Sequence, residues 1–283
     1  MPGSAFRVPR FSRLAPTSRS LFTVNRSRSS FLLLLNSPLV ATRVLRRDTR
    51  GSSSPVVVET GAGQYFVKLR GAAQGTAALV AEVLVAELAD RIGLPVPERR
   101  VVIFEPGLES NDRNDELADL LAASRGENLG FKFLPAARPF VKEDLGLVTP
   151  DFAAQVRWLD WLVMNPDRSP ANPNLMVEGK RLWLIDHGAA LPFQHDWDAV
   201  TAESPLRPPP KVPHLLAGIA ADVAGWDELL TPLFTPDSLA ESVAAIPDSF
   251  LLPLLAAGAD LAARRKAYGD FLWRRLSGPH ALG

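Results

Sequence analysis

The sequence of 283 residues contains no cysteine, which excludes disulfide bonds, thiolate metal sites and a cysteine nucleophile. It also has no long apolar run, and Phe31–Leu35 is far shorter than the roughly 20 residues that a membrane helix needs. Neither sign of charge is in excess, because 31 basic residues balance 31 acidic ones. The balance gives no general attraction to nucleic acid or to an anionic membrane. We therefore expect a cytoplasmic protein without a membrane partner and without direct nucleic-acid binding.

Histidine is scarce, with four in the chain, and no H-E-x-x-H spacing predicts a zinc site. Acidic residues are missing from residues 1–38, which are rich in Arg and Ser. A transit peptide has this composition, and so does a disordered basic extension. The second interpretation is favoured because no amphipathic face is evident. The remaining chain is long enough for one large domain or two lobes with a sizeable core.

The most informative stretch is residues 158–191, where three polar residues recur at a meaningful spacing. Asp167 follows an Asn-Pro break, Asn172 comes five residues later, and Asp186 ends the apolar run LWLID before a His-Gly pair. Kinase catalytic loops contain an Asp with an Asn five positions on, and a second Asp just before a Gly. In that template the first Asp accepts the proton of the substrate hydroxyl. The Asn and the second Asp hold Mg²⁺ between the phosphates.

A predicted hairpin explains how these residues would meet. The runs Asn174–Val177 and Arg181–Ile185 are apolar and β-prone, and a Glu-Gly-Lys turn separates them. Such a hairpin would return the chain so that Asn172 and Asp186 lie side by side. Two converging oxygen ligands suit Mg²⁺, which takes few protein ligands and keeps several waters. The alternative is that these are ordinary turn and helix-capping residues.

A lysine inside an apolar strand is the next candidate. Gln64–Arg70 predicts a strand, and Lys68 within it corresponds to the phosphate-pairing lysine of the kinase string V-A-I-K. A solvent-facing lysine would show the same pattern. A helix over Ala77–Ile92 follows, with Thr76 as its expected N-cap.

The predicted helix carries two glutamates that could pair with this lysine. Glu82 lies near the apolar face of the helix and would hold Lys68 toward the phosphates, as the helix glutamate does in kinases. Glu87 is the rival and points more toward solvent on the helical wheel. The simplest alternative for Glu82 is a surface residue in a helix that it suits well. Further helical patterns lie at Pro150–Met164, His214–Val223, Thr235–Ala245, Pro253–Ala256 and Asp260–Leu276.

From about Leu39 to Leu276 the chain resembles the HipA-like kinases, specifically the smaller subgroup without an extra N-terminal domain. The resemblance is carried by G-S-S-S-P at Gly51–Pro55, Y-F-V-K-L-R-G at Tyr65–Gly71, G-L-P-V-P at Gly93–Pro97, N-P-D-R-S-P-A-N-P-N-L-M at Asn165–Met176 and L-W-L-I-D-H-G at Leu182–Gly188. It implies an α+β, two-lobed protein-kinase-like fold that binds ATP between a β-rich N-lobe over 39–140 and a mainly helical C-lobe over 141–283.

The resemblance also implies roles for individual residues. It places Lys68 on ATP with Glu82 as its partner, Asp167 as the catalytic base, and Asn172 with Asp186 on Mg²⁺. Because the string N-P-N allows either register, Asn174 competes with Asn172 as the metal ligand. The serines of the small-residue turn, Ser52, Ser53 and Ser54, would contact phosphate or be autophosphorylated, as a loop serine can be in HipA proper.

The sequence departs from the family in two places. His187 stands where protein kinases have the Phe of D-F-G, which puts switching by that Phe in doubt. The positive residue often found inside the HipA catalytic loop is replaced by Ser169–Ala171. Arg168 is the expected partial substitute for its charge.

The resulting hypothesis is an ATP- and Mg²⁺-dependent kinase that phosphorylates a Ser or Thr of a protein. A small-molecule or lipid kinase is the alternative within the enzyme class. The departures favour a second alternative, a pseudokinase that acts as a nucleotide- or partner-binding module. An antitoxin-like partner is among the expected interactions.

Overall fold

The computed structural model describes residues 35, 37–48, 54–72, 74–110, 112, 114–209, 211–280 and 282. The N-terminal part holds β1 (Leu39–Arg47), β2 (Val56–Thr60), β3 (Gly63–Lys68), α2 (Gly75–Arg91), β4 (Arg99–Phe104), β5 (Glu109–Ser110), α3 (Asp115–Ala123), β6 (Gly126–Lys132) and β7 (Arg138–Pro139). The C-terminal part holds η1 (Lys142–Leu147), α4 (Pro150–Leu162), β8 (Leu175–Glu178), β9 (Arg181–Leu184), η2 (Pro192–His195), η3 (Ser204–Leu206), α5 (Val223–Leu230), η4 (Thr231–Leu233), α6 (Pro236–Ala244), α7 (Asp248–Leu251), η5 (Leu252–Leu254) and α8 (Leu261–Ser277).

The first six strands form one sheet in the order β2-β3-β6-β4-β1-β5, and an additional pairing of β2 with β1 closes five of them into a barrel. Small and branched apolar side chains such as Val56, Val58 and Val102 fill its interior. Gly130 is required on β6, because a Cβ there would lie 2.5 Å from a methyl of Val102. Helix α3 covers one end of the barrel through Leu117.

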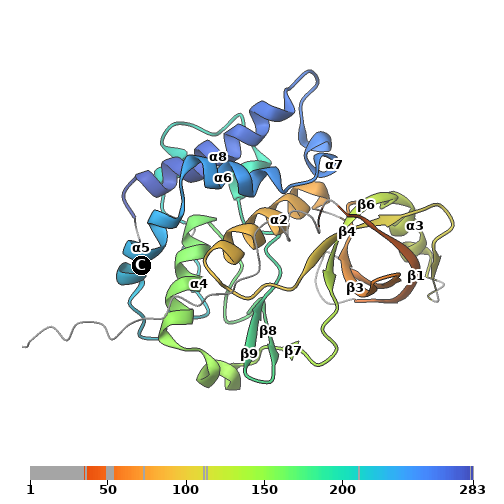
Figure 1. Cartoon of the computed structure of the whole chain (residues 1–283), viewed down its shortest axis with the longest axis horizontal. Coiled ribbons are helices and arrows are strands. Elements are labelled where there is room, and N and C mark those ends of the chain that lie inside the picture. The colour runs from red at the N-terminus through yellow and green to blue at the C-terminus, as the bar shows by residue number, and fades with distance from the viewer. Residues whose placement is uncertain are drawn as a thin grey trace, which may run out of the picture.

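Helix α2 lies between the strands and the C-terminal helices (Figure 1). It is buried on all sides over most of its length, as expected for a helix that is apolar all round. Its last residue, Arg91, donates to the carbonyl of Ser238 (2.8 Å), so α2 is fixed to α6. The sheet, α2 and the C-terminal helices therefore share the larger hydrophobic core. The boundary predicted at residue 140 stays a prediction.

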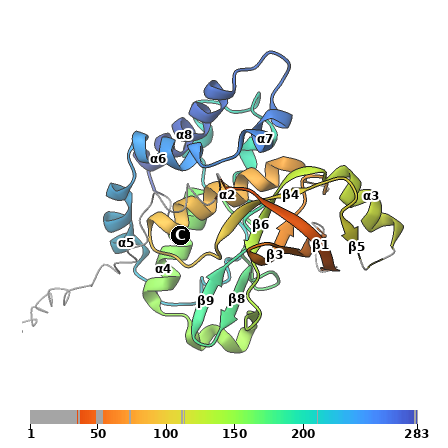
Figure 2. The same ribbon diagram turned by 45° about the vertical axis from the view of Figure 1, so that its right-hand side comes forward.

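The expected class is confirmed: a strand-rich N-terminal region precedes a mainly helical C-terminal part. The predicted hairpin is present as β8 and β9, with Leu175 opposite Leu184, and β7 pairs with β8. Figure 2 shows this small sheet beside α4, on the side of the molecule away from α8. No helix in the described part of the chain is long and apolar enough to cross a membrane.

Two helical predictions are wrong. In the first, residues 214–222 contain a turn at 215–218 but no helix, and α5 begins at Val223 with Asp222 as its N-cap. The segment is held by tertiary contacts at its start: the backbone N–H of Leu215 donates to the carbonyl of Arg168 (2.9 Å), and His214 Nε2 binds Asp160 Oδ2 (2.9 Å). Within the segment, the N–H of Leu216 donates to His214 Nδ1 (3.1 Å). Similarly, helix was expected over 253–256, but α7 and η5 end at Leu254.

Candidate active site

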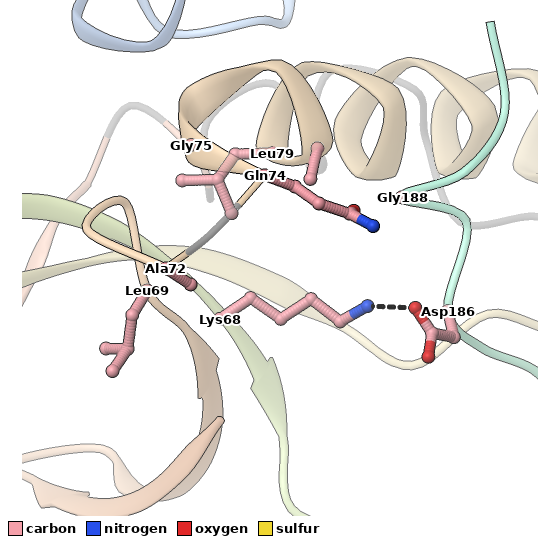
Figure 3. Close-up of a pocket in the computed structure, with 9 residues that line it drawn as sticks. Lys68, Leu69, Ala72, Gln74, Gly75, Leu79, Asp186 and Gly188 are labelled. Atoms are coloured by element: carbon pink, nitrogen blue, oxygen red, sulfur yellow. Dashed lines mark hydrogen bonds and ion pairs between the residues drawn. The ribbon is translucent and has the colours of Figure 1, made fainter. Parts of the chain in front are cut away.

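Lys68, Glu82 and Asp186 meet at one point although they come from three distant parts of the chain. Lys68 ends β3, Glu82 lies in the second turn of α2, and Asp186 follows β9. The Lys68 ammonium forms ion pairs with the Glu82 carboxylate and with Asp186 Oδ1, the latter at 2.5 Å (Figure 3). Lys68 therefore faces the interior of the site, which rejects the solvent-facing alternative.

The ion pairs are deeply buried. The Glu82 side chain is 0% exposed and the Lys68 side chain 9%, whereas the Asp186 side chain is 45% exposed. Burial opposes the charge on Lys68, but the two carboxylates outweigh it and raise the lysine pKa. Burial also opposes ionisation of Asp186, yet Lys68 holds the pKa of that carboxyl below its ordinary value. At neutral pH the site thus presents a cation and an ionised, accessible carboxylate.

The two glutamates of α2 have different partners. Glu82 faces Lys68, while Glu87 binds the buried guanidinium of Arg99 on β4. The choice of Glu82 is therefore supported by geometry, and Glu82 is not the surface residue of the simplest alternative. The rival Glu87 helps to fix α2 to the sheet.

Asp167 lies in the loop after α4 and has both candidate asparagines beside it. Its Oδ2 accepts from Nδ2 of Asn172 (2.9 Å) and from Nδ2 of Asn174 (3.1 Å). Its Oδ1 makes no hydrogen bond within the described part of the chain. Asn174 is buried and Asn172 exposed, and the carbonyl of Asn174 accepts from the N–H of Ile185 (3.1 Å), next to Asp186. The structure keeps both asparagines at the site, so the choice of metal ligand between them stays open.

Arg168 does not point into the site, so its expected role as a substitute cation is wrong. The residue is 1% exposed, and its Nε donates to Asp160 Oδ2 (2.7 Å). Its Nη1 donates to the carbonyl of Asn174 (2.6 Å). The guanidinium therefore ties the loop that carries Asp167 to the entrance of the β8–β9 hairpin.

Asp160, in α4, is the centre of this buried network. Besides Arg168, it accepts from Nδ2 of Asn165 (2.8 Å) and binds His214 Nε2 (2.9 Å). Burial would raise its pKa, but Arg168 and His214 together hold the pKa below the ordinary carboxyl value. The network joins α4, the Asp167 loop and the segment at 214 into one support.

The backbone around the loop is strained. The described chain has five non-glycine residues at positive φ, and four of them frame this region: Met164 (52°), Asn174 (48°), Asp186 (56°) and Leu191 (58°). Such conformations cost on the order of 1–3 kcal/mol each and persist where the surroundings impose them. Buried hydrogen bonds impose them here, including Leu191 N–H to the carbonyl of Val163 (2.8 Å).

His187, in place of the D-F-G phenylalanine, is fully buried. Burial and the nearby Arg168 lower its pKa to about 3, so the ring is neutral. Its Nδ1 lies 3.5 Å from an Nη atom of Arg168, which makes Nδ1 the acceptor and places the proton on Nε2. The residue packs as an internal polar ring that is continuous with the Asp160 network.

A pocket opens next to the Lys68–Asp186 pair, and its lining residues on α2 and in the loop before α2 were not predicted from the sequence. Figure 3 shows the pocket, which is lined by Lys68, Leu69, Ala72, Gln74, Gly75, Ala78, Leu79, Asp186 and Gly188. The sequence predicted Thr76 as the N-cap of this helix. Instead Thr76 is buried inside α2, and Gln74 is the N-cap residue without a side-chain capping bond. The closely spaced Gly71 and Gly75 before the helix were the available signal.

Of the three serines in the predicted phosphate-binding turn, the structure describes Ser54. Ser52 and Ser53 lie outside the described residues, so their expected contact with phosphate stays a prediction. Ser54 is described: it has φ +40°, and its Oγ accepts from Arg47 (3.1 Å).

Comparison with known proteins defines the class. Residues 41–203 match the sequence model of the HipA-like kinase family. Because the match covers more than half of the chain, the protein belongs to the HipA-like kinase family. No curated protein matches the sequence.

Two solved structures resemble the fold at low sequence identity. One is the proinflammatory kinase CtkA of Helicobacter pylori, with 12% identity, a TM-score of 0.45, and coverage of 79% of this chain and 94% of that one. The other is the Golgi casein kinase, with 14% identity, a TM-score of 0.47, and coverage of 87% and 76%.

Proposed function

We propose that this kinase transfers the γ-phosphoryl group of ATP, with Mg²⁺, to a serine or threonine hydroxyl of a protein. The observation that carries the proposal is the convergence of Lys68, Glu82 and Asp186, with Asp186 separated from Lys68 by 118 residues. A fold has no structural need to bury a lysine between two carboxylates, since burying such charges is costly. A functional role explains the arrangement: in kinases a lysine held by a helix glutamate binds the phosphates of the nucleotide.

The residues present fit a nucleotide and a magnesium ion. Lys68 supplies a cation for the phosphates, and Glu82 fixes its position. Asp186 offers an ionised and partly exposed carboxylate, and the asparagine amides offer further oxygen ligands of the kind that Mg²⁺ prefers. When bound, the metal would offset the negative charge of the phosphates.

Asp167 is suited to the acceptor hydroxyl. Its Oδ2 is fixed by Asn172 and Asn174, which orients the carboxylate, while Oδ1 is left to accept a hydrogen bond from the incoming hydroxyl. The chain thus contributes mainly positioning and electrostatics, as is usual in phosphoryl transfer. The protein substrate and its Ser/Thr specificity rest on the family resemblance, not on a described surface.

The contact between Lys68 and Asp186 favours a second candidate function, nucleotide binding without transfer. In this arrangement the metal-binding carboxylate is engaged by the lysine at 2.5 Å. A pseudokinase that keeps this pair closed would bind nucleotide weakly or without metal.

The test combines binding and transfer. Thermal unfolding is measured with ATP, with and without Mg²⁺, for wild type, Asp186→Asn and the exposed control Asp198→Asn. A ligand at a hundred times its Kd adds about 2.7 kcal/mol of stability. A Mg²⁺-dependent upshift that is lost only in Asp186→Asn supports the site.

Transfer is then followed with γ-labelled ATP and a mixture of cell proteins, a lipid extract and small hydroxyl compounds. Label on protein Ser or Thr, absent in Asp167→Asn, supports the proposal. Label on lipids or small molecules alone would replace the protein substrate with one of those classes. An upshift that ignores Mg²⁺, without any transfer, would establish the pseudokinase instead.

A further inference from the structure

The side chain of Gln74 points toward the pocket and makes no hydrogen bond that would stabilise the fold of the described residues. It lines the pocket together with Lys68, Asp186 and Gly188 (Figure 3). It is the N-cap residue of α2, yet its side chain caps nothing, and it forms no side-chain hydrogen bond within the described part of the chain. An exposed amide with two donors and one acceptor is therefore available at the edge of the site.

The position of this amide relative to the metal-binding segment is well defined. A Cβ added to Gly188 would lie 3.5 Å from Gln74 Oε1 and 3.3 Å from the Ala78 Cβ. The amide thus lies directly over Gly188, two residues after Asp186. Glycine at 188 allows α2 and the Asp186 segment to come this close.

The remaining pocket wall suits a small, negatively charged group. Ala72, Gly75, Ala78 and Gly188 leave space because they have little or no side chain. The first turn of α2 carries no acidic residue. Lys68 contributes a cation and Asp186 the carboxylate of the metal site, so a phosphoryl group that arrives with Mg²⁺ would meet the lysine and an amide donor within the same pocket.

We propose that Gln74 binds the terminal phosphate of the nucleotide, with Nε2 donating to a non-bridging oxygen of the γ-phosphoryl group. The inference rests on the proposed kinase function. The γ-phosphoryl is assigned because kinases pair the strand lysine with the α- and β-phosphates, while the metal-binding Asp lies toward the γ-phosphate. Gln74 lines the same pocket as Lys68 and Asp186, and its amide lies against Gly188, two residues after the metal-binding Asp. Gln74 would then distinguish ATP from ADP.

The experiment is isothermal titration of the full chain in Mg²⁺ with AMP-PNP, which retains a γ-phosphoryl group, and with ADP, which lacks it. The variants are Gln74→Ala and Gln74→Glu. Gln64→Ala is the matched control, since Gln64 is also an exposed glutamine, lies on β3 and is outside the pocket. Because Gln74 is exposed, the variants are expected to fold, which an unchanged unfolding midpoint verifies.

Removal of one hydrogen bond to a charged group is expected to weaken AMP-PNP binding about tenfold in Gln74→Ala. Gln74→Glu should weaken it further, because the new carboxylate repels the phosphate. ADP affinity should change by less than about twofold in Gln74→Ala, and Gln64→Ala should change neither affinity.

Two results would overturn the inference alone: unchanged AMP-PNP affinity in Gln74→Ala, or equal losses for AMP-PNP and ADP while wild type binds both. If the wild-type protein binds neither AMP-PNP nor ADP, the proposed function is overturned, and this inference with it. The wild-type titration therefore distinguishes a failure of the proposed function from a failure of the inference about Gln74.

Discussion

The ion pair between Lys68 and Glu82 should make Lys68→Met a severely destabilising change. The variant would leave Glu82, with a 0% exposed side chain, as a buried carboxylate that has lost its cation. Breaking a buried pair by removing one partner typically costs about 3–5 kcal/mol. Glu82→Gln should cost less, about 1–3 kcal/mol, because Lys68 keeps Asp186 as a partner.

A double-mutant cycle tests this asymmetry. Urea unfolding at pH 7 is measured for Lys68→Met, Glu82→Gln and the double variant, with Lys266→Met as control. Lys266 forms an exposed pair with Asp270 (side chains 73% and 58% exposed) and should change stability by no more than about 0.5 kcal/mol. The double variant should be more stable than Lys68→Met, since the uncompensated carboxylate is gone.

The pH dependence of Lys68→Met gives an independent check. Without Lys68, burial raises the folded-state pKa of Glu82 above its unfolded value. A group with a raised folded pKa contributes stability that is lost as pH rises, so Lys68→Met should become more stable as pH falls from 7 toward 5. The reasoning is refuted if Lys68→Met lies within 1 kcal/mol of wild type and the two single changes are additive.

Three further predictions concern the supports of the site. Arg275→Met should lower the free energy of unfolding by about 2–4 kcal/mol, because the buried guanidinium donates to the carbonyls of Trp161, Pro205 and Arg207. Arg274 is its exposed neighbour, and Arg274→Met should change the free energy of unfolding by less than about 0.5 kcal/mol. Urea unfolding of the two variants tests the difference. Asp160→Asn should cost about 3–5 kcal/mol at pH 7. Because the folded-state pKa of Asp160 is depressed, the wild-type advantage should shrink as pH falls below about 4, and equal differences at pH 7 and pH 3 would contradict this. Gly130→Ala should cost about 1–3 kcal/mol by overpacking against Val102, while Gly146→Ala, with open space around it, should be nearly neutral in thermal unfolding.

The local elements of the site were predictable because their signals are local. The β8–β9 hairpin follows from two apolar runs around a Glu-Gly-Lys turn, and Gly179 there does adopt a positive φ of 61°. The Asp167 and Asp186 positions follow from motif spacing. The strand containing Lys68 and the helix containing Glu82 were also found within a few residues at each end.

The expectations that were wrong depended on contacts from distant segments. The sequence predicted Arg168 as a cation for phosphate, but its guanidinium is buried, where it donates to Asp160 and to the carbonyl of Asn174. Residues 214–222 were expected to begin a helix, yet they form no helix, and Leu215 and His214 are bound to Arg168 and Asp160. Gln74 gave no signal, because its position over Gly188 exists only when α2 has packed beside the Asp186 segment.

The chemical groups that this protein can bring to a site follow from its amino-acid sequence alone: a strand lysine, a helix glutamate, and an Asp-Asn-Asp set around a hairpin. Their spacing along the chain reflects local backbone geometry, which short segments encode. Their arrangement follows from long-range packing: Lys68 lies between Glu82 and Asp186, Arg168 is a buried support, and Gln74 faces a pocket. Each of these depends on desolvation and on pairing between residues far apart in the chain, and therefore exists only in the packed fold.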